Sequence, residues 1–243
     1  MTRNILFLLI VVSVQNSRAG FWGDRLDELA SPFTTDAKYF LLAGSATTAL
    51  FALDTVEDTL GHDVQNETVE NKPLGSLSTI GDYAGQTIPN AIYAGVMYGL
   101  YKYFGDETYY KKSVLMFKAS LYSGVVANGL KAIVREPRPN VRSSRESFPS
   151  GHTTTAFAFA SVVGTQHEWY WAVPAYGLAS MVAFSRINDN KHWLHDVIAG
   201  AVLGTTYGLS LTYLAQEKEK SNVSYFVSPL GKDGFYGSVA IEF

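Results

Sequence analysis

Residues 197–216 read VIAGAVLGTTYGLSLTYLAQ, which is twenty residues without an Asp, Glu, Lys or Arg. The run is too long and too rich in alanine and glycine for a strand, so it predicts a helix. Its length is about that needed to cross the hydrocarbon core of a bilayer. Gly200, Gly204 and Gly208 recur every fourth residue and form one smooth stripe along this helix. Such a stripe favours close contact with a neighbouring helix, in a membrane bundle or in a soluble core.

Shorter charge-free runs of the same composition precede this helix. They lie at residues 39–53, 83–101, 119–130, 153–166 and 169–185. Together the runs predict an all-α fold, a six-helix up-down bundle. Of the five, only 83–101 approaches the length of a bilayer span, and the mean hydropathy of +0.03 is low for a chain with many spans. The glycine stripe and the longest runs favour membrane association, whereas the shorter runs leave a soluble bundle as the alternative.

The composition excludes several classes of protein. Hydrophobic residues make up 47% of the 243 residues and charged residues only 17%, which excludes a disordered or coiled-coil chain. The formal net charge of −3 predicts no nucleic-acid partner. The chain has no cysteine, so disulfides, thiolate metal sites and cysteine nucleophiles are all excluded.

The two ends of the chain differ from the helical region at 20–220. Residues 1–19 combine Arg3, an apolar run at 5–12 and small residues before Gly20, the pattern of a secretory signal peptide; an uncleaved membrane anchor is the alternative. Residues 221–243 contain two alternating apolar segments around a Gly-Lys-Asp-Gly turn and predict a short C-terminal β-hairpin. Between the first two predicted helices, residues 54–73 carry six acidic side chains and are expected to form a solvated loop.

Three polar segments lie at the ends of predicted helices. The first, KAIVREPRP at residues 131–139, places Lys131 in the last helical turns and holds Arg138 in an extended segment between two prolines. The second, FPSGH at 148–152, opens the fourth helix, whose free N–H groups form an anion site that the backbone of Gly151 can approach closely.

The third segment closes the fifth helix with Ser185 and Arg186 and opens the sixth with HWLHD at 192–196. His192 and Asp196 are four residues apart, so the carboxylate can orient the imidazole on one helical face. In an up-down bundle the three segments must meet at the same end. Three cations, a helix N-terminus and two histidines would then surround one pocket, as binding and transfer of a phosphate dianion require.

These motifs resemble the three signatures of the type-2 phosphatidic acid phosphatase superfamily, which includes bacterial class A acid phosphatases and vanadium-dependent haloperoxidases. The resemblance covers roughly residues 37–216. It implies that His192 attacks phosphorus and becomes a phosphohistidine, that Asp196 orients His192, and that His152 protonates the leaving oxygen and then activates water. It further implies that the phosphoryl oxygens are held by Lys131, Arg138, Arg186, Ser150 and the Gly151 N–H. We expect no metal and no cofactor, because the cations supply the positive charge.

Other histidines and arginines are interpreted as ordinary residues. His62 and His167 are expected at the surface, and His195, although about 60° from His192 around the helix, matches no motif position and is left outside the site. Arg135, Arg142 and Arg145 are expected to be surface charges, with recognition of a second phosphate or an anionic headgroup as the alternative.

The expected function is a metal-independent phosphatase that acts on an amphiphilic phosphate monoester or pyrophosphate, such as a phospholipid, polyprenyl or lipid A phosphate. The alternatives are a soluble periplasmic acid phosphatase, a vanadium haloperoxidase, an inactive envelope module and phosphotransfer to an acceptor other than water.

Charge indicates where the site lies. Lysines gather at the end opposite the motifs, which by the positive-inside rule puts the site in the cell envelope on the periplasmic side. The lysines are Lys102, Lys111, Lys112, Lys218 and Lys220.

Overall fold

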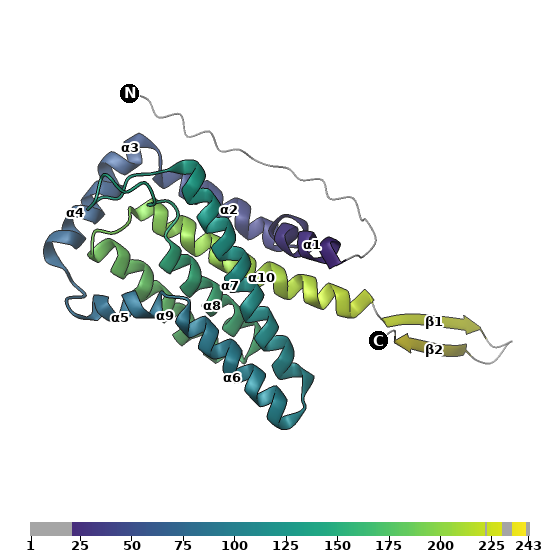
Figure 1. Cartoon of the computed structure of the whole chain (residues 1–243). Coiled ribbons are helices and arrows are strands. Elements are labelled where there is room, and N and C mark those ends of the chain that lie inside the picture. Colours follow the sequence, from purple (N-terminus) through teal and green to yellow (C-terminus); the bar gives the residue numbers. More distant parts are fainter. Residues whose placement is uncertain (1–20, 222, 230–234, 242–243) are drawn as a thin grey trace.

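The computed structural model describes residues 21–221, 223–229 and 235–241, and nearly all of them are helical (Figure 1). The predicted signal peptide at 1–19 lies outside the described residues. In chain order the elements are α1 (Phe21–Thr34), α2 (Ala37–Phe51), α3 (Asp54–Val56), the π-helical turn η1 (Glu57–Gly61), α4 (His62–Asn71), α5 (Leu77–Ala84), α6 (Ile88–Phe104), α7 (Glu107–Val134), α8 (Gly151–Gln166), α9 (Trp169–Asn188), α10 (Leu194–Ser221), β1 (Val223–Pro229) and β2 (Phe235–Ile241).

Helix α8 lies at the centre of the bundle and packs against α7, α9 and α10. Its contact with α10 uses the predicted glycine stripe. A Cβ atom added to Gly200 would lie 2.6 Å from the carbonyl oxygen of Ser150, and one added to Gly208 would lie 2.5 Å from Cβ of Ser161. The two helices therefore meet at a distance that only glycine permits along this face, and the expectation of close helix contact is confirmed.

The core between these helices is built mainly from small and aliphatic side chains. Its fully or nearly fully buried members include Met116, Ala119, Ala156, Ala160, Val162, Ala179, Val182 and Leu211. Small side chains let helix axes approach closely, so the alanine-rich runs of the sequence become the interior of the bundle.

The six charge-free runs correspond to α2, α6, α7, α8, α9 and α10, but the count of six helices is wrong. Helices α1, α4 and α5 are also present. All three contain charged or polar residues, so a search for charge-free runs could not find them.

Helix α1 is held by an ion-pair cluster. The buried carboxylate of Glu28 contacts Lys118 Nζ at 2.5 Å and accepts a hydrogen bond from the Tyr122 hydroxyl at 2.7 Å. The Ser31 and Ser210 hydroxyls lie 2.8 Å apart and link α1 to α10. These contacts compensate the burial of a charged side chain, and they explain why an amphipathic helix joins the bundle here.

The acidic segment at 54–73 is not a solvated loop. It forms α3, η1 and α4, and the side chains of Gln65 and Thr68 are buried. Gln65 Nε2 donates to Asn190 Oδ1 at 2.7 Å, so α4 is docked over the end of α9. The acidic side chains on the outer face of α4 hide this docking in the sequence, because the inward-facing residues are polar.

The strands β1 and β2 pair antiparallel, with Val223 opposite Ile241 and Pro229 opposite Phe235. The residues between them, 230–234, and the last two residues lie outside the described residues. The predicted turn and the role of this C-terminal segment therefore stay predictions.

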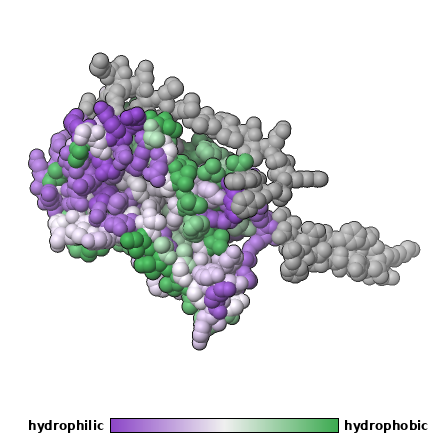
Figure 2. All heavy atoms as spheres, in the orientation of Figure 1, coloured by the Kyte–Doolittle hydropathy of each residue, from purple (hydrophilic) through white to green (hydrophobic). Residues whose placement is uncertain are grey.

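Exposed apolar side chains form two stripes on the outside of the bundle. Ile88, Ile92 and Val96 on α6 are 52–60% exposed, and Phe117, Leu121 and Val125 on the neighbouring helix α7 are 46–62% exposed. Figure 2 shows hydrophobic residues over the middle of the bundle and hydrophilic residues over the end with α3 and α4. Within the described residues, one helix segment, Leu194–Glu219, is long and apolar enough to span a membrane, and 61% of an apolar 18-residue stretch of it is buried.

Candidate active site

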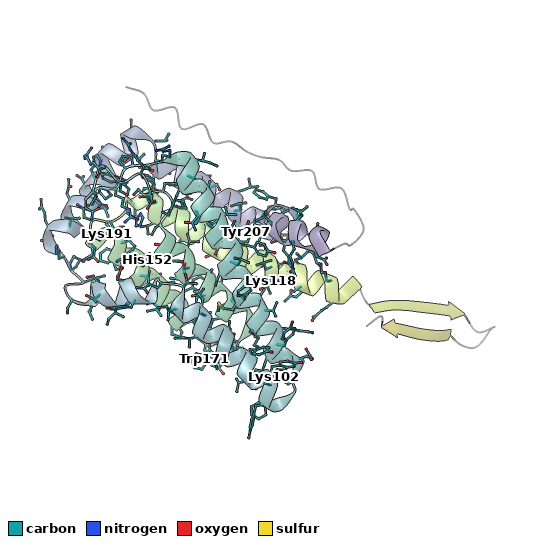
Figure 3. All side chains as sticks on the ribbon, viewed as in Figure 1. Lys102, Lys118, His152, Trp171, Lys191 and Tyr207 are labelled. Carbon is teal, nitrogen blue, oxygen red and sulfur yellow. The ribbon has the colours of Figure 1, made fainter. Side chains whose placement is uncertain are left out.

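The three predicted motifs meet at one end of the bundle. Lys131 lies in the last turn of α7, His152 in the first turn of α8, Arg186 in the last turn of α9 and His192 in the loop before α10. Figure 3 shows His152 and Lys191 at this end and Lys102 at the opposite end. The loop after α7 is tied to the loop before α10 by the Trp193 indole, whose N–H donates to the Pro137 carbonyl at 3.0 Å.

His192 is buried against a carboxylate. Its Nδ1 lies 3.6 Å from Asp196 Oδ2 and 3.5 Å from the Ser147 hydroxyl. Oδ2 also accepts hydrogen bonds from Ser147 Oγ at 2.6 Å and from the backbone N–H of Trp193 at 2.8 Å. A carboxylate facing Nδ1 favours the tautomer with the proton on that nitrogen, which leaves the lone pair on Nε2. Burial lowers the pKa of His192, so its imidazole is neutral at neutral pH.

The first turn of α8 is fixed relative to α10. The backbone N–H of Ser150 donates to the carbonyl of Asp196 at 3.0 Å, and Ser150 is fully buried. Ser150 precedes the helix in an extended conformation, and its side chain caps none of the helix N–H groups. The N–H groups of Gly151 and His152 thus stay available at the positive end of the helix dipole, as an anion site requires.

Two of the predicted cations have unused donors in the interior. Within the described part of the chain, the Nε groups of Arg138 and Arg186 are buried and have no hydrogen-bond partner. Buried N–H groups are almost always paired in folded proteins, so two such donors on two arginines fit an anionic ligand. The third cation, Lys131, donates to the carbonyls of Glu146 at 2.7 Å and Pro149 at 2.6 Å and so holds the segment before α8.

Asp82 on α5 was not predicted as part of the site. Its Oδ1 lies 2.5 Å from Arg186 Nη1 and 3.4 Å from His152 Nε2. Hydrogen bonding to Arg186 holds the pKa of the Asp82 carboxyl below its usual value, so it is ionised at neutral pH. The sequence gives no motif for Asp82, because it lies before the three signatures and between the predicted loop at 54–73 and the predicted helix at 83–101.

His195 and Glu136 form a second buried layer behind Asp196. His195 Nε2 lies 3.1 Å from Glu136 Oε2 and 3.5 Å from Asp196 Oδ1, and all three side chains are buried. Their ligand atoms lie within 4.8 Å of one another and could hold a metal ion. The His195 imidazole already pairs with Glu136 Oε2, whereas the buried Asp196 Oδ1 has no hydrogen-bond partner within the described residues. Leaving His195 out of the predicted site therefore missed a neighbour of Asp196.

The remaining predicted surface charges are exposed, namely Arg135, Arg142 and Arg145. His167 lies at the far end of the bundle, where its Nε2 is 2.7 Å from the Tyr93 hydroxyl. A cavity of about 470 Å³ adjoins the site, and its walls include Gly151 and His152.

Comparisons with known proteins agree with this geometry. The family model for the PAP2 superfamily matches residues 113–220. A lipid A 1-phosphatase of Porphyromonas gingivalis is 43% identical over 70 residues, which cover 27% of this chain and 16% of that protein. A lipid A 1-phosphatase of Rhizobium johnstonii is 31% identical over 108 residues, which cover 39% of this chain and 44% of that protein. The chain thus spans less than half the length of these relatives.

Two solved structures share the fold. A transmembrane PAP2-type phosphatidylglycerolphosphate phosphatase from Bacillus subtilis has a TM-score of 0.62 at 18% identity and covers 74% of this chain and 95% of that one. Aquifex aeolicus LpxE has a TM-score of 0.53 at 22% identity, and the match covers 64% of this chain and 96% of that one. The family model and the curated relatives confirm the resemblance that the motifs indicate, and the helical fold is that of these two solved structures.

Proposed function

We propose, from the PAP2 superfamily region at residues 113–220, that the protein is a phosphatase that hydrolyses a lipid phosphate monoester or pyrophosphate. One observation carries the proposal. The buried, unpartnered Nε groups of Arg138 and Arg186 lie at the same end of the bundle as an imidazole whose Nδ1 faces a buried carboxylate. This is the combination that phosphoryl transfer needs, namely donors for the equatorial oxygens and an oriented nucleophile.

The proposed reaction has two steps. His192 Nε2 attacks phosphorus, a P–N bond forms as the P–O bond to the leaving group breaks, and His152 in its protonated form gives a proton to the leaving oxygen. Burial lowers the pKa of His152 to about 4, so the bound phosphate dianion and Asp82, 3.4 Å from His152 Nε2, must stabilise this protonated form. In the second step His152 takes a proton from water, the resulting hydroxide attacks phosphorus, and the P–N bond breaks to release inorganic phosphate. Asp196 stabilises the positive charge on the His192 ring through Nδ1.

The positive charge in this mechanism comes from the chain itself. Arg138, Arg186 and the first N–H groups of α8 bind the phosphoryl oxygens, with Lys131 and Ser150 holding the segment that presents them. Charge-assisted hydrogen bonds of this kind are about twice as strong as neutral ones and can neutralise a dianion. The mechanism therefore needs neither a metal nor a cofactor.

A membrane location follows from the exposed apolar stripes on α6 and α7, which a bilayer would cover. The acidic helix α4 lies at the site end, and the lysines gather at the other end, where Figure 3 shows Lys102. These lysines favour a periplasmic site by the positive-inside rule, although the exposed Arg135, Arg142 and Arg145 at the site end favour the opposite face. In a soluble acid phosphatase, the main alternative, these apolar stripes would be exposed to water, which is unfavourable.

The proposal is tested by phosphate release from a panel of lipid and soluble phosphate esters by the purified full chain. We expect release from lipid phosphates, inhibition by vanadate, which resembles the transition state, and no inhibition by EDTA. Equal rates on soluble and lipid esters would favour the acid phosphatase, and peroxide-dependent halide oxidation with added vanadate would identify a haloperoxidase. Absence of release from every ester would contradict the proposal.

Asp82 gives a test of the anion site. Its ionised carboxylate contacts both Arg186 and His152, where a phosphoryl oxygen would also bind. Asp82→Asn removes this negative charge and keeps the side-chain shape, so we expect vanadate to inhibit the variant about threefold to tenfold more tightly. The control is Asp63→Asn, which removes the same charge from the exposed face of α4 and should leave inhibition unchanged. Weaker inhibition of Asp82→Asn would show instead that Asp82 positions Arg186 for the phosphate.

A further inference from the structure

The cavity of about 470 Å³ beside the site has walls from three parts of the chain. They are the α5–α6 junction, the middle of α7 and the first two turns of α8. His152 and Gly151 form part of the wall, whereas His192 does not. In an in-line displacement the leaving group departs on the side of phosphorus opposite the nucleophile. If His192 attacks, the leaving group must therefore depart on the side where His152 and this cavity lie.

The polar groups in the cavity wall are neutral and of two kinds. Gln86 and Asn128 contribute amides, and Thr87, Ser120, Thr154 and Thr155 contribute hydroxyls. Apart from His152, no side chain of the described wall can carry a charge. A wall of this composition can hydrogen-bond hydroxyl groups in both directions, but it cannot neutralise a second phosphate.

Two of the hydroxyls are oriented by the bundle behind them. The buried Asn90 amide donates to Ser120 Oγ at 2.7 Å, so the Ser120 proton is free to be donated. The Thr155 hydroxyl donates to the Gly151 carbonyl at 3.1 Å, so its oxygen can accept. Asn90 also donates to the Thr155 carbonyl at 3.3 Å, which ties α6 to α8. The wall thus presents one fixed donor and one fixed acceptor, and preorganised groups of this kind give selectivity.

The cavity opens toward the apolar outside of the bundle. Ile88 is one of its wall residues and is also 58% exposed, and it begins the apolar stripe of α6. Ala127, in contrast, is buried at the inner side. A lipid could therefore keep its chains along the α6 and α7 stripes while its polar headgroup lies inside.

We propose that this cavity is the leaving-group subsite and that it selects an uncharged polar headgroup with the size of a sugar ring. The inference rests on the proposed phosphatase function and makes that function more specific. A volume of about 470 Å³ is in the usual range for small-molecule sites and accommodates a ring rather than a single hydroxyl. The donor and acceptor pattern matches a sugar headgroup, and it matches diacylglycerol poorly because that leaving group has no further hydroxyl.

Gly124 provides a way to fill the cavity without disturbing the fold. A Cβ atom at Gly124 would meet no atom within 4 Å, and Gly124 is a wall residue. Gly129, five residues along the same helix, is equally open but is not a wall residue. Leucine is a better helix former than glycine, so both Gly124→Leu and Gly129→Leu should fold. Asn128→Leu removes one amide at nearly constant volume.

The first measurement is kcat/KM of the full chain and its variants on lipid A, phosphatidylglycerol phosphate and phosphatidate, in a detergent without a sugar headgroup. We expect the wild type to prefer lipid A, whose leaving group is a sugar. Gly124→Leu and Asn128→Leu should each lower kcat/KM on lipid A at least about tenfold and lower it less on phosphatidate. Gly129→Leu should leave all three values unchanged. Preference for phosphatidylglycerol phosphate, whose leaving group carries a charged phosphodiester, would overturn the neutral subsite.

The second measurement does not depend on turnover. Saturation-transfer NMR with octyl glucoside should show contact with the wild type and with Gly129→Leu, and this contact should be lost in Gly124→Leu. Sugar binding without any phosphate release would overturn the phosphatase and, with it, the role of the cavity as a leaving-group subsite. The subsite would be overturned, and the phosphatase left intact, if the ratio of kcat/KM on lipid A to kcat/KM on phosphatidate were the same in all variants. Octyl glucoside contact that survives Gly124→Leu would have the same consequence.

Discussion

Replacing His192 by asparagine is expected to lower kcat/KM for phosphate release by at least about 10³-fold, because the variant has no imidazole to attack phosphorus. Asp196→Asn should lower kcat/KM by a smaller factor, since the nucleophile is still present but has lost the carboxylate near Nδ1. The double variant should be no slower than His192→Asn alone, because residues that act as one unit do not contribute additively. Steady-state kinetics on a lipid phosphate measure all three.

A covalent intermediate distinguishes this mechanism from direct attack by water. Quenching the wild type during turnover of a ³²P-labelled substrate should trap an acid-labile, base-stable phosphoenzyme, as a phosphohistidine is, and His192→Asn should trap none. His167→Asn is the control, because that side chain lies at the far end of the bundle against Tyr93. Unchanged labelling in His192→Asn would refute the assignment of the nucleophile.

The pH dependence gives an independent readout of the same residue. Only the neutral imidazole has a lone pair for attack, so activity is lost when acid protonates His192. Since burial lowers the pKa of His192 from its ordinary value of 6.5, this acid limb of kcat/KM should lie below pH 6.5.

The helices that form the core could be predicted because they consist of apolar residues without charge. The helices missed were those whose inward-facing residues are polar and find partners only in the folded protein. Glu28 is an example, because nothing in its local sequence shows that Lys118 and Tyr122, ninety or more residues away, surround it. Gln65 is another, since its partner Asn190 is 125 residues away.

The site could be predicted to the extent that helix connectivity determines it. Consecutive antiparallel helices bring Lys131, His152, Arg186 and His192 to one end of the bundle, and the structure has them there. Asp82 and Glu136 were missed for a geometric reason. Asp82 reaches Arg186 from a short helix outside the predicted six, and the approach of Glu136 to His195 depends on the path of the loop after α7.

The α8–α10 contact supports both the fold and the site, and Gly204 is where it can be tested. A Cβ atom at Gly204 would overlap the carbonyl oxygen of Thr154 and lie 2.8 Å from the backbone nitrogen of Ala158. Backbone atoms of a central helix cannot move aside as a flexible side chain can, so Gly204→Val must push α8 and α10 apart. We expect the free energy of unfolding to fall by about 3 kcal/mol or more.

For a chain of this size such a loss lowers the unfolding temperature by about 6–12 °C, which differential scanning in detergent would measure. The matched control is Gly95→Val on α6, where an added Cβ meets no atom within 4 Å, so the same substitution should shift the midpoint little. Separation of the helices also stretches the bond between Ser150 N–H and the Asp196 carbonyl, because these residues begin α8 and α10. Gly204→Val should therefore lose phosphatase activity at temperatures where it is still folded. A variant as stable and as active as Gly95→Val would show that the two helices do not depend on glycine for their contact.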